Sequence, residues 1–202
     1  MARPKNQSQR RMEIIQATHR AINSRGVASL RLKDIASEAQ LSIGLIHYYF
    51  PNMEELVFAV HQSQIAAFIE KRKILLELPE SPAQLLYRMI SMGLPENSDD
   101  EVFRLFYELH SLAVRSQPHA ELMATLWKEE VQNGYLEIFK RGVADGSFKM
   151  SCDPHDCAIR MVAFEDGLSV QLLSRNNYIT LERALQVMLD YASEATGCAI
   201  IK

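Results

Sequence analysis

The chain has 202 residues, of which 48% are hydrophobic and 23% are charged, so it can fill a core and is not expected to be disordered. The basic, polar N-terminus has no apolar stretch like that of a signal peptide, and no later apolar run has the length of a membrane span. These features argue against a secreted or membrane-embedded protein and predict a cytoplasmic location.

The net charge of -3 conceals an asymmetry along the chain. Residues 1–50 contain eight Lys or Arg and three Asp or Glu, a balance of +5, so residues 51–202 carry -8. A basic N-terminal quarter favours a polyanion such as nucleic acid as its partner. A solvated charged surface explains the same charges equally well, so charge alone does not decide.

Apolar residues recur at spacings of three and four almost throughout the chain, which is typical of an all-α protein. The first helix is expected over residues 9–25 and a short second helix over 32–39. Ser42 is suited to cap a third helix, which Pro51 ends by Phe50. Six longer helices are expected at about 53–77, 82–93, 99–116, 119–145, 154–175 and 180–196.

Two short helices joined by a tight turn, preceded by a longer helix in the basic part of the chain, are typical of a helix-turn-helix unit. We therefore predict an all-α fold with two domains. The first is an N-terminal three-helix DNA-binding domain over residues 1–52. The second, over residues 53–202, is a larger helical bundle for effector binding and dimerisation.

The segment "LSIGLIHYYFPNMEEL" crowds four rings into the third helix and can be divided by face. At about 100° per residue, Ile46 and Phe50 share one side, which we expect to be buried. The opposite side carries Gly44, Leu45, His47 and Tyr48. This side suits DNA, because a glycine lets the backbone approach closely, and hydroxyl and apolar groups can contact phosphates and thymine methyls. Packing between helices is the alternative for the tyrosines, and it is stronger for Tyr49 than for Tyr48.

The run "LRLKDIASEAQLSIGLIHYYFPNMEEL", residues 30–56, closely resembles the TetR family of bacterial transcriptional regulators. The residues that match the family motif are Asp34, Ile35, Ala36, Ala39, Ser42, Gly44, Tyr48, Tyr49 and Phe50. The resemblance implies a homodimeric repressor that binds a palindromic operator in double-stranded DNA and is released by a small-molecule effector. The predicted DNA-contacting residues are Arg31, Lys33, Ser42, Ile43, Gly44, Leu45, His47, Tyr48 and Tyr49.

Several positions depart from the family motif. Leu30 and Arg31 replace a threonine pair, and His47 replaces the commonest tyrosine. Arg31 can supply a stronger phosphate contact than threonine. Gln40 replaces the turn glycine and must either adopt a positive φ or bend the turn differently. Met53 replaces a phosphate-binding lysine, which should lower the salt dependence of binding by about one unit of slope.

The C-terminal region, in particular residues 153–192, resembles the BetI-like subgroup of that family more loosely. Its final helix carries apolar residues on two sides, which indicates a partner outside the chain as well as a core. Together with the helix before it, this helix would form the four-helix dimer interface that the resemblance implies. The predicted dimer-interface residues are Leu168, Leu172, Leu185, Met188, Leu189 and Ala192.

A small-molecule site is expected among the helices of the larger domain. The candidate lining residues are Phe103, Phe106, Tyr107, His110, Met123, Trp127, Phe164 and Glu165. An ordinary helical core uses the same residue types. Glu165 and His110 are more informative, because an ionisable group in an apolar bundle needs a partner. Three alternatives are open for Glu165. It binds a cationic or hydrogen-bonding ligand, it forms a salt bridge to Arg160, or its carboxylate is exposed at the dimer edge.

Cys152, Cys157 and Cys198 are an odd number of cysteines in a chain with no export signal, so we expect reduced thiols. The segment "CDPHDC", residues 152–157, contains ligand types but not the spacing of a zinc knuckle, so no metal site is expected. No cofactor is expected either.

The chain contains no Gly-rich phosphate loop, Gly-x-Ser-x-Gly elbow, His-Glu-x-x-His sequence or Glu-x-x-His pair. An enzyme is therefore not expected. The alternative to a regulator is a helical small-molecule-binding or interaction module whose basic N-terminus binds nucleic acid non-specifically. Such a module would not need the ordered Ser42-x-Gly44 and ring pattern.

Overall fold

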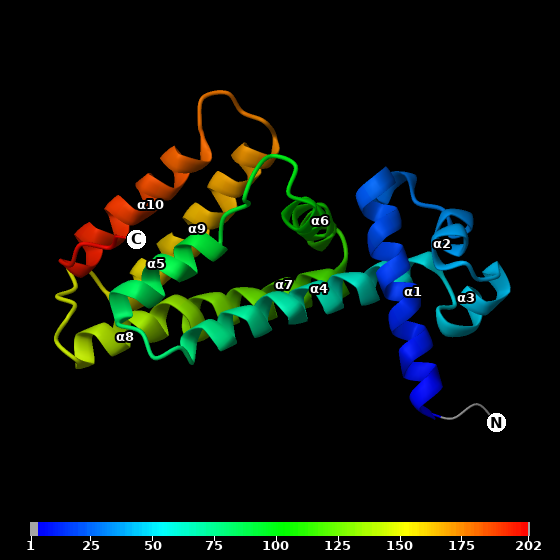
Figure 1. Ribbon diagram of the computed structural model, residues 1–202, viewed down its shortest axis with the longest axis horizontal. Coiled ribbons are helices and arrows are strands. Elements are labelled where there is room, and N and C mark those ends of the chain that lie inside the picture. Colours follow the sequence, from blue (N-terminus) through cyan, green and yellow to red (C-terminus); the bar gives the residue numbers. More distant parts are fainter. Residues whose placement is uncertain (1–3, 202) are drawn as a thin grey trace. The chain divides into compact units, whose positions relative to one another are not determined.

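The computed structural model describes residues 4–201, with side chains from Gln7 onward, and every regular element in this range is helical (Figure 1). The predicted all-α class is confirmed. The elements are α1 (Pro4–Arg25), η1 (Val27–Ser29), α2 (Leu32–Ala39), α3 (Ile43–Tyr49), α4 (Met53–Leu76), α5 (Pro82–Met92), α6 (Glu101–His110), η2 (Ser111–Val114), α7 (Gln117–Lys128), η3 (Glu129–Tyr135), α8 (Leu136–Ala144), α9 (Pro154–Leu173) and α10 (Leu181–Thr196).

Local capping explains most of the helix starts. The hydroxyls of Ser42 and Thr180 accept hydrogen bonds from the backbone N–H groups of Leu45 and Arg183, both at 3.2 Å, and so fix the starts of α3 and α10. Two predicted helices differ from the structure. The helix expected over 99–116 ends at His110 and continues as the short η2. The helix expected over 119–145 is interrupted by η3, a π-helical segment that the hydrophobic spacing does not reveal.

The chain divides into two compact units. The first contains the residues up to Ala66 together with Arg104–Leu122, and the second contains Ala67–Phe103 and the residues from Met123 onward. The division falls inside α4, α6 and α7, so the proposed domain boundary between residues 52 and 53 stays a prediction. None of the helices within residues 4–201 combines the length and the apolar character that crossing a bilayer requires.

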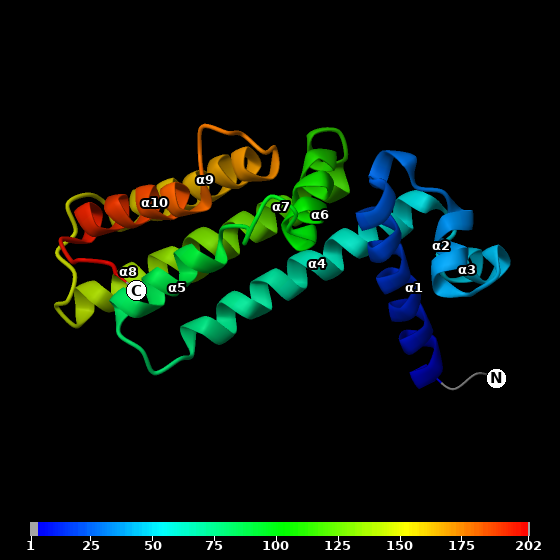
Figure 2. The same ribbon diagram turned by 45° about the horizontal axis from the view of Figure 1, so that its top comes forward.

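In the first unit, α1 packs against α2 and α2 against α3, around a core of apolar side chains. This core includes Ile14, Ile15, Ile22, Ile35, Ile46, Phe50, Leu56, Leu105 and Leu109. In the second unit, α10 packs against α5 and α9, while α8 packs against α5, α9 and η3 (Figure 2). Its core includes Leu86, Met89, Val131, Tyr135, Phe139, Met161, Met188 and Ala192.

Three of the residues predicted to contact a second copy lie in this core. Met188 and Ala192 are fully buried within the chain, and Leu189 is buried as well, so their side chains complete its own core. The packing of α10 against α5 and α9 covers these side chains, so their burial does not support the assignment to a dimer interface. Leu168, Leu172 and Leu185 are half-buried and pack at the edge of the core. They therefore keep surface that a second copy could contact.

Candidate DNA-reading surface and buried polar cluster

The faces of α3 lie as the helical projection predicts. Ile46 and Phe50 are buried in the core of the first unit, whereas Tyr48 is 69% exposed and Ile43 is 44% exposed. Gly44 and His47 are also exposed, and Leu45 is half-buried. Tyr49 is half-buried against the core, with its ring edge-on to Tyr48 at 5.1 Å between centroids. The rings therefore divide into a buried set and an exposed set.

The turn between α2 and α3 uses a left-handed residue. Gln40 has φ 55° and ψ 40°, so of the two expected solutions the chain adopts the positive φ. Before α2, the Asp34 carboxylate accepts a hydrogen bond from the Arg31 backbone N–H at 3.2 Å and lies 3.7 Å from Arg25. The side chains of Arg31 and Lys33 are exposed at the start of α2, where a phosphate could reach them.

A hydrogen bond determines which ring nitrogen of His47 carries the proton. Its Nδ1 lies 3.2 Å from the carbonyl oxygen of Pro51, and a carbonyl can only accept, so Nδ1 carries the proton. In the neutral ring Nε2 is then an acceptor. Through this nitrogen His47 can accept a hydrogen bond from the amino group of a base.

Three residues of α1 were missing from the predicted DNA surface. Gln7, Ser8 and Arg11 line a shallow depression of about 300 Å³ together with Tyr48 and Tyr49. The guanidinium of Arg11 lies 4.7 Å from the centre of the Phe50 ring, which holds this cation beside α3. The positive charge of the N-terminal region indicated a polyanionic partner. Only the packing of α1 shows which of its residues lie beside the tyrosines of α3.

The predicted ligand-binding residues are divided between the two compact units. Phe106, Tyr107 and His110 belong to the first unit, while the other five belong to the second. Trp127 is 42% exposed, and Phe164 packs edge-on against Tyr191 at 5.1 Å. Glu165 is buried among the helices of the bundle, as the sequence predicts, but its cationic partner is Arg72 and not Arg160. Arg160 instead donates to the Tyr191 hydroxyl at 3.5 Å.

Glu165 belongs to a buried polar cluster in the second unit. The Arg72 Nη2 lies 2.8 Å from Glu165 Oε2 and 3.4 Å from Glu130 Oε1, and the Tyr135 hydroxyl donates to Glu165. Arg72 also lies over the Phe68 ring at 4.6 Å. All four polar side chains of this cluster are buried, and Glu130 and Tyr135 lie in the π-helical η3. Such interruptions of α-helices are frequent at functional sites.

Burial controls protonation in this cluster. Loss of solvent raises the pKa of Glu130 to about 8, with Arg72 opposing the rise and Glu165 adding to it. Burial likewise raises the pKa of Glu165, against the effects of Arg72 and Tyr135. The cluster therefore contains one guanidinium for two carboxyl groups, and burial favours the protonated form of both.

The cluster lies close to a surface cleft of the second unit. Phe103, Met92, Leu94 and Lys71 are among the residues that line this cleft, which has a volume of about 390 Å³. Gly93 lies between two of these lining residues, and a Cβ atom there would lie 1.8 Å from Glu165 Oε1. The buried carboxylate therefore lies against the backbone of Gly93, between two residues that line the cleft. Neither Arg72 nor Glu130 was predicted, because each lies in a charged run that reads as solvated surface.

Three histidines meet in the first unit. The Nδ1 atoms of His61 and His119 lie 2.7 Å apart and both rings are buried, so one ring donates and the other accepts. The ring of His110 lies 6.4 Å from that of His61. Burial, followed by the charges of His119 and His110, lowers the pKa of His61 to about 4, and burial lowers the pKa of His110 to about 4.

We expect the stability of the protein to fall as the pH drops from about 6.5 to 4. The unfolded chain takes up protons on His61 and His110 near pH 6.5, whereas these two rings stay neutral in the folded protein down to about pH 4. Between these values the unfolded state binds more protons, and His110 alone should cost about 3 kcal/mol by pH 4. The replacement His110→Phe should make the dependence shallower in urea unfolding at pH 7, 5.5 and 4.5. Parallel pH curves for parent and variant would contradict this assignment.

Cys152 and Cys157 are joined by a disulfide, which corrects the expectation that all three cysteines are thiols; Cys198 is free. Sequence counting could not show this, because the pairing depends on how the start of α9 brings the two residues together. Potential ligand atoms of Asp153, His155 and Asp156 lie within 4.8 Å of one another. The Asp153 carboxylate, however, already accepts from the backbone N–H groups of both other residues and so caps α9.

Comparison with known proteins agrees with these features. Residues 14–60 match the bacterial regulatory proteins of the tetR family, and residues 82–196 match the C-terminal region of BetI-type transcriptional repressors. The chain is 27% identical over 164 residues to the nicotine-responsive transcriptional repressor HdnoR of Paenarthrobacter nicotinovorans, covering 80% of this chain and 82% of that protein.

Two solved structures share the fold over nearly their whole length. A TetR transcription regulator from Haloarcula marismortui is 22% identical, with a TM-score of 0.83, over 94% of this chain and 99% of that one. A transcriptional regulator from Saccharomonospora viridis in complex with choline is 21% identical, with a TM-score of 0.84, over 94% and 98%. The BetI-type match alone covers more than half of the sequence, so the chain is a transcriptional regulator and not an enzyme: it belongs to the TetR family and has a BetI-type C-terminal domain.

Proposed function

We propose that this regulator is a repressor that binds a palindromic operator as a homodimer and is released by a small-molecule effector. The observation that carries the DNA part is the exposed face of α3, where Tyr48, Ile43 and Gly44 project from a helix whose opposite side is core. In a dimer, two such helices would enter successive major grooves about 34 Å apart. The exposed cations of Arg11, Arg31 and Lys33 would contact phosphates beside them. The expected place of action is the cytoplasm, where the DNA is.

We expect Tyr48→Ala to lower operator affinity about 10-fold, because it removes a hydroxyl and a flat apolar surface worth about 1.4 kcal/mol. The operator would first be selected from random duplexes and then titrated by gel shift at about 0.1 M salt. Tyr178→Ala is the matched control, since Tyr178 is 97% exposed in the second unit. Equal losses in both variants, or no preferred sequence in the selection, would refute the proposed reading surface.

The half-buried Leu168, Leu172 and Leu185, with the exposed Val170, supply the apolar surface for the proposed dimer. They lie on α9 and α10, which pack against each other in the second unit. A symmetric pair of these helices would bury the leucine side chains that the chain's own core covers only in part.

For the effector we propose an organic cation bound at the cleft beside Gly93, with the carboxyl groups of Glu130 and Glu165 as its electrostatic partners. The cluster contains two carboxyl groups and one guanidinium, and a cation in the cleft would favour ionisation of Glu130, whose pKa is raised by burial to about 8. The rings of Phe68 and Phe103 lie edge-on to each other nearby, with their centroids 6.3 Å apart. Choline bound to one structural relative and nicotine named for another are both amines or ammonium ions, which supports this class.

The effector proposal can be tested by thermal shift. Choline and nicotine would be compared with 3,3-dimethylbutanol, the neutral isostere of choline. A cation that binds the folded state raises the melting temperature by mass action, and it should also weaken the gel shift. Equal effects of the neutral and charged compounds would argue against the carboxyl groups as partners.

A further inference from the structure

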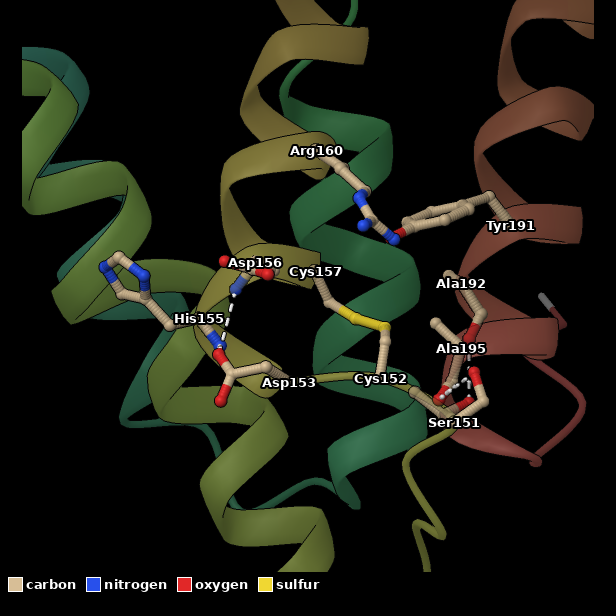
Figure 3. The surroundings of a disulfide bond; sticks show 11 residues. Ser151, Cys152, Asp153, His155, Asp156, Cys157, Arg160, Tyr191, Ala192 and Ala195 are labelled. Atoms are coloured by element: carbon tan, nitrogen blue, oxygen red, sulfur yellow. Dashed lines mark hydrogen bonds between the residues drawn. A yellow bond between two sulfur atoms is a disulfide. The ribbon is translucent and has the colours of Figure 1, made fainter.

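The disulfide between Cys152 and Cys157 has no part in the DNA-reading surface or in the buried polar cluster. Cys152 lies just before α9, and Cys157 lies in the first turn of that helix (Figure 3). Thiols are kept reduced where chromosomal DNA is found, and the disulfides that form there are mostly transient, catalytic or redox-sensing. We propose that Cys152 and Cys157 are a reversible redox pair through which this regulator responds to hydroperoxides. The inference rests on the proposed action at DNA in the cytoplasm.

Burial assigns different roles to the two sulfurs. Cys157 is fully buried in the core of the second unit, whereas Cys152 is half-buried and can be reached from solvent. In the reduced protein the Cys152 thiolate attacks the hydroperoxide, the O–O bond breaks, and a sulfenic acid forms with release of water or an alcohol. The Cys157 thiolate then attacks the Cys152 sulfur, the S–O bond breaks and water leaves. Two thiols thus supply the two electrons and two protons that reduce one hydroperoxide.

The backbone holds the two cysteines together without help from the sulfur–sulfur bond. Asp153 caps α9 by accepting from the N–H groups of His155 at 2.9 Å and Asp156 at 3.2 Å. The Cys157 N–H donates to the Asp153 carbonyl oxygen at 3.0 Å. These bonds do not depend on the oxidation state, so the thiols stay adjacent after reduction and can form the disulfide again. A reducing dithiol would attack at the accessible Cys152 sulfur and release Cys157.

The disulfide lies next to a segment that is hydrogen-bonded to another helix of the second unit. Two backbone hydrogen bonds join the residues before Cys152 to the C-terminal end of α10. Lys149 N–H donates to Thr196 O at 2.7 Å. Ser151 N–H donates to Ala195 O at 2.9 Å (Figure 3). The bond therefore ties the segment attached to α10 to the first turn of α9. Since α9 and α10 are the helices proposed to form the dimer, oxidation would restrict the motion of the dimerising pair, and we expect operator affinity to change at least 3-fold.

The test begins with full-length protein reduced by dithiothreitol and desalted. One equivalent of hydrogen peroxide should lower the titratable thiols from three to one, and peptide mass spectrometry should find residues 152 and 157 linked. In Cys157→Ser, dimedone should trap a sulfenic acid on Cys152. Cys198→Ser is the matched control, because it should still lose two thiols. If Cys157→Ser does not fold, thiol titration of the parent and of Cys198→Ser still decides the chemistry.

Two physical readouts complete the experiment. The oxidised form should melt roughly 5 °C above the reduced form, because the bond restricts the unfolded chain. Three thiols remaining after peroxide, or a disulfide that dithiothreitol cannot reduce in the folded protein, would overturn the redox pair. Equal operator affinity of both forms would overturn its regulatory role. The thiol measurements use no DNA, so their failure is distinguishable from failure of the proposed operator binding.

Discussion

Gly44→Leu is expected to lower operator affinity on the order of 100-fold while leaving the protein folded, a loss of about 2.7 kcal/mol in binding free energy. Gly44 is exposed on α3, and a Cβ atom added there meets nothing within 4 Å in the described part of the chain. Leucine also favours a helix over glycine by roughly 0.5–1 kcal/mol. The free protein should therefore be as stable as the parent or more stable, whereas the added side chain would hold the α3 backbone away from the duplex.

The measurement pairs a gel shift on the selected operator with thermal melting of the free protein. Gly44→Ala should give a smaller loss of affinity, because its side chain is shorter. Ala124→Leu places the same leucine on an exposed helical position of the second unit and should leave affinity unchanged. An unchanged operator affinity in Gly44→Leu would show that α3 does not approach DNA through this glycine.

Arg72→Met is expected to destabilise the fold by about 3–5 kcal/mol at pH 8, which is the largest stability effect that we predict. The replacement keeps an apolar stem of similar length but leaves Glu165 and Glu130 buried without their guanidinium. Arg72 lowers the pKa of both carboxyl groups, so without it both would take up protons more readily. The loss should therefore be smaller at pH 5.5, where protonation of the two carboxyl groups costs less.

Urea unfolding at pH 8 and pH 5.5 measures both parts of this prediction. Arg88→Met is the matched control, because Arg88 forms a largely exposed ion pair with Glu80 at 2.7 Å. Such surface pairs contribute about 0–1 kcal/mol. The double variant Arg72→Met with Glu165→Gln should recover part of the stability, since it removes one uncompensated charge. Equal losses for Arg72→Met and Arg88→Met would mean that the cluster is solvated.

Local sequence signals determined most of the helices and the reading face. Ser42 caps α3, Pro51 excludes further helix after Phe50, and the spacing of Ile46 and Phe50 assigns one side of α3 to the core. Each of these effects acts within a few residues, so the sequence alone is enough to predict it. For Gln40 the sequence left two solutions, and the structure shows that the chain adopts the positive φ.

Only the tertiary structure decided what lies inside the second unit. Arg72, Glu130 and Glu165 are far apart in the sequence, and their helices bring both carboxylates within 3.4 Å of the Arg72 guanidinium. From the sequence, Arg72 and Glu130 were indistinguishable from solvated charges, and the partner of Glu165 was undecided. Met188 and Ala192 form an apolar stripe that fits a dimer or a core equally well, and the packing of α10 on α5 and α9 makes them core. The disulfide of Cys152 and Cys157 likewise depends on where the start of α9 places two side chains. Periodicity reports which face of a helix is apolar, but the neighbour that covers that face is set by contacts between distant parts of the chain.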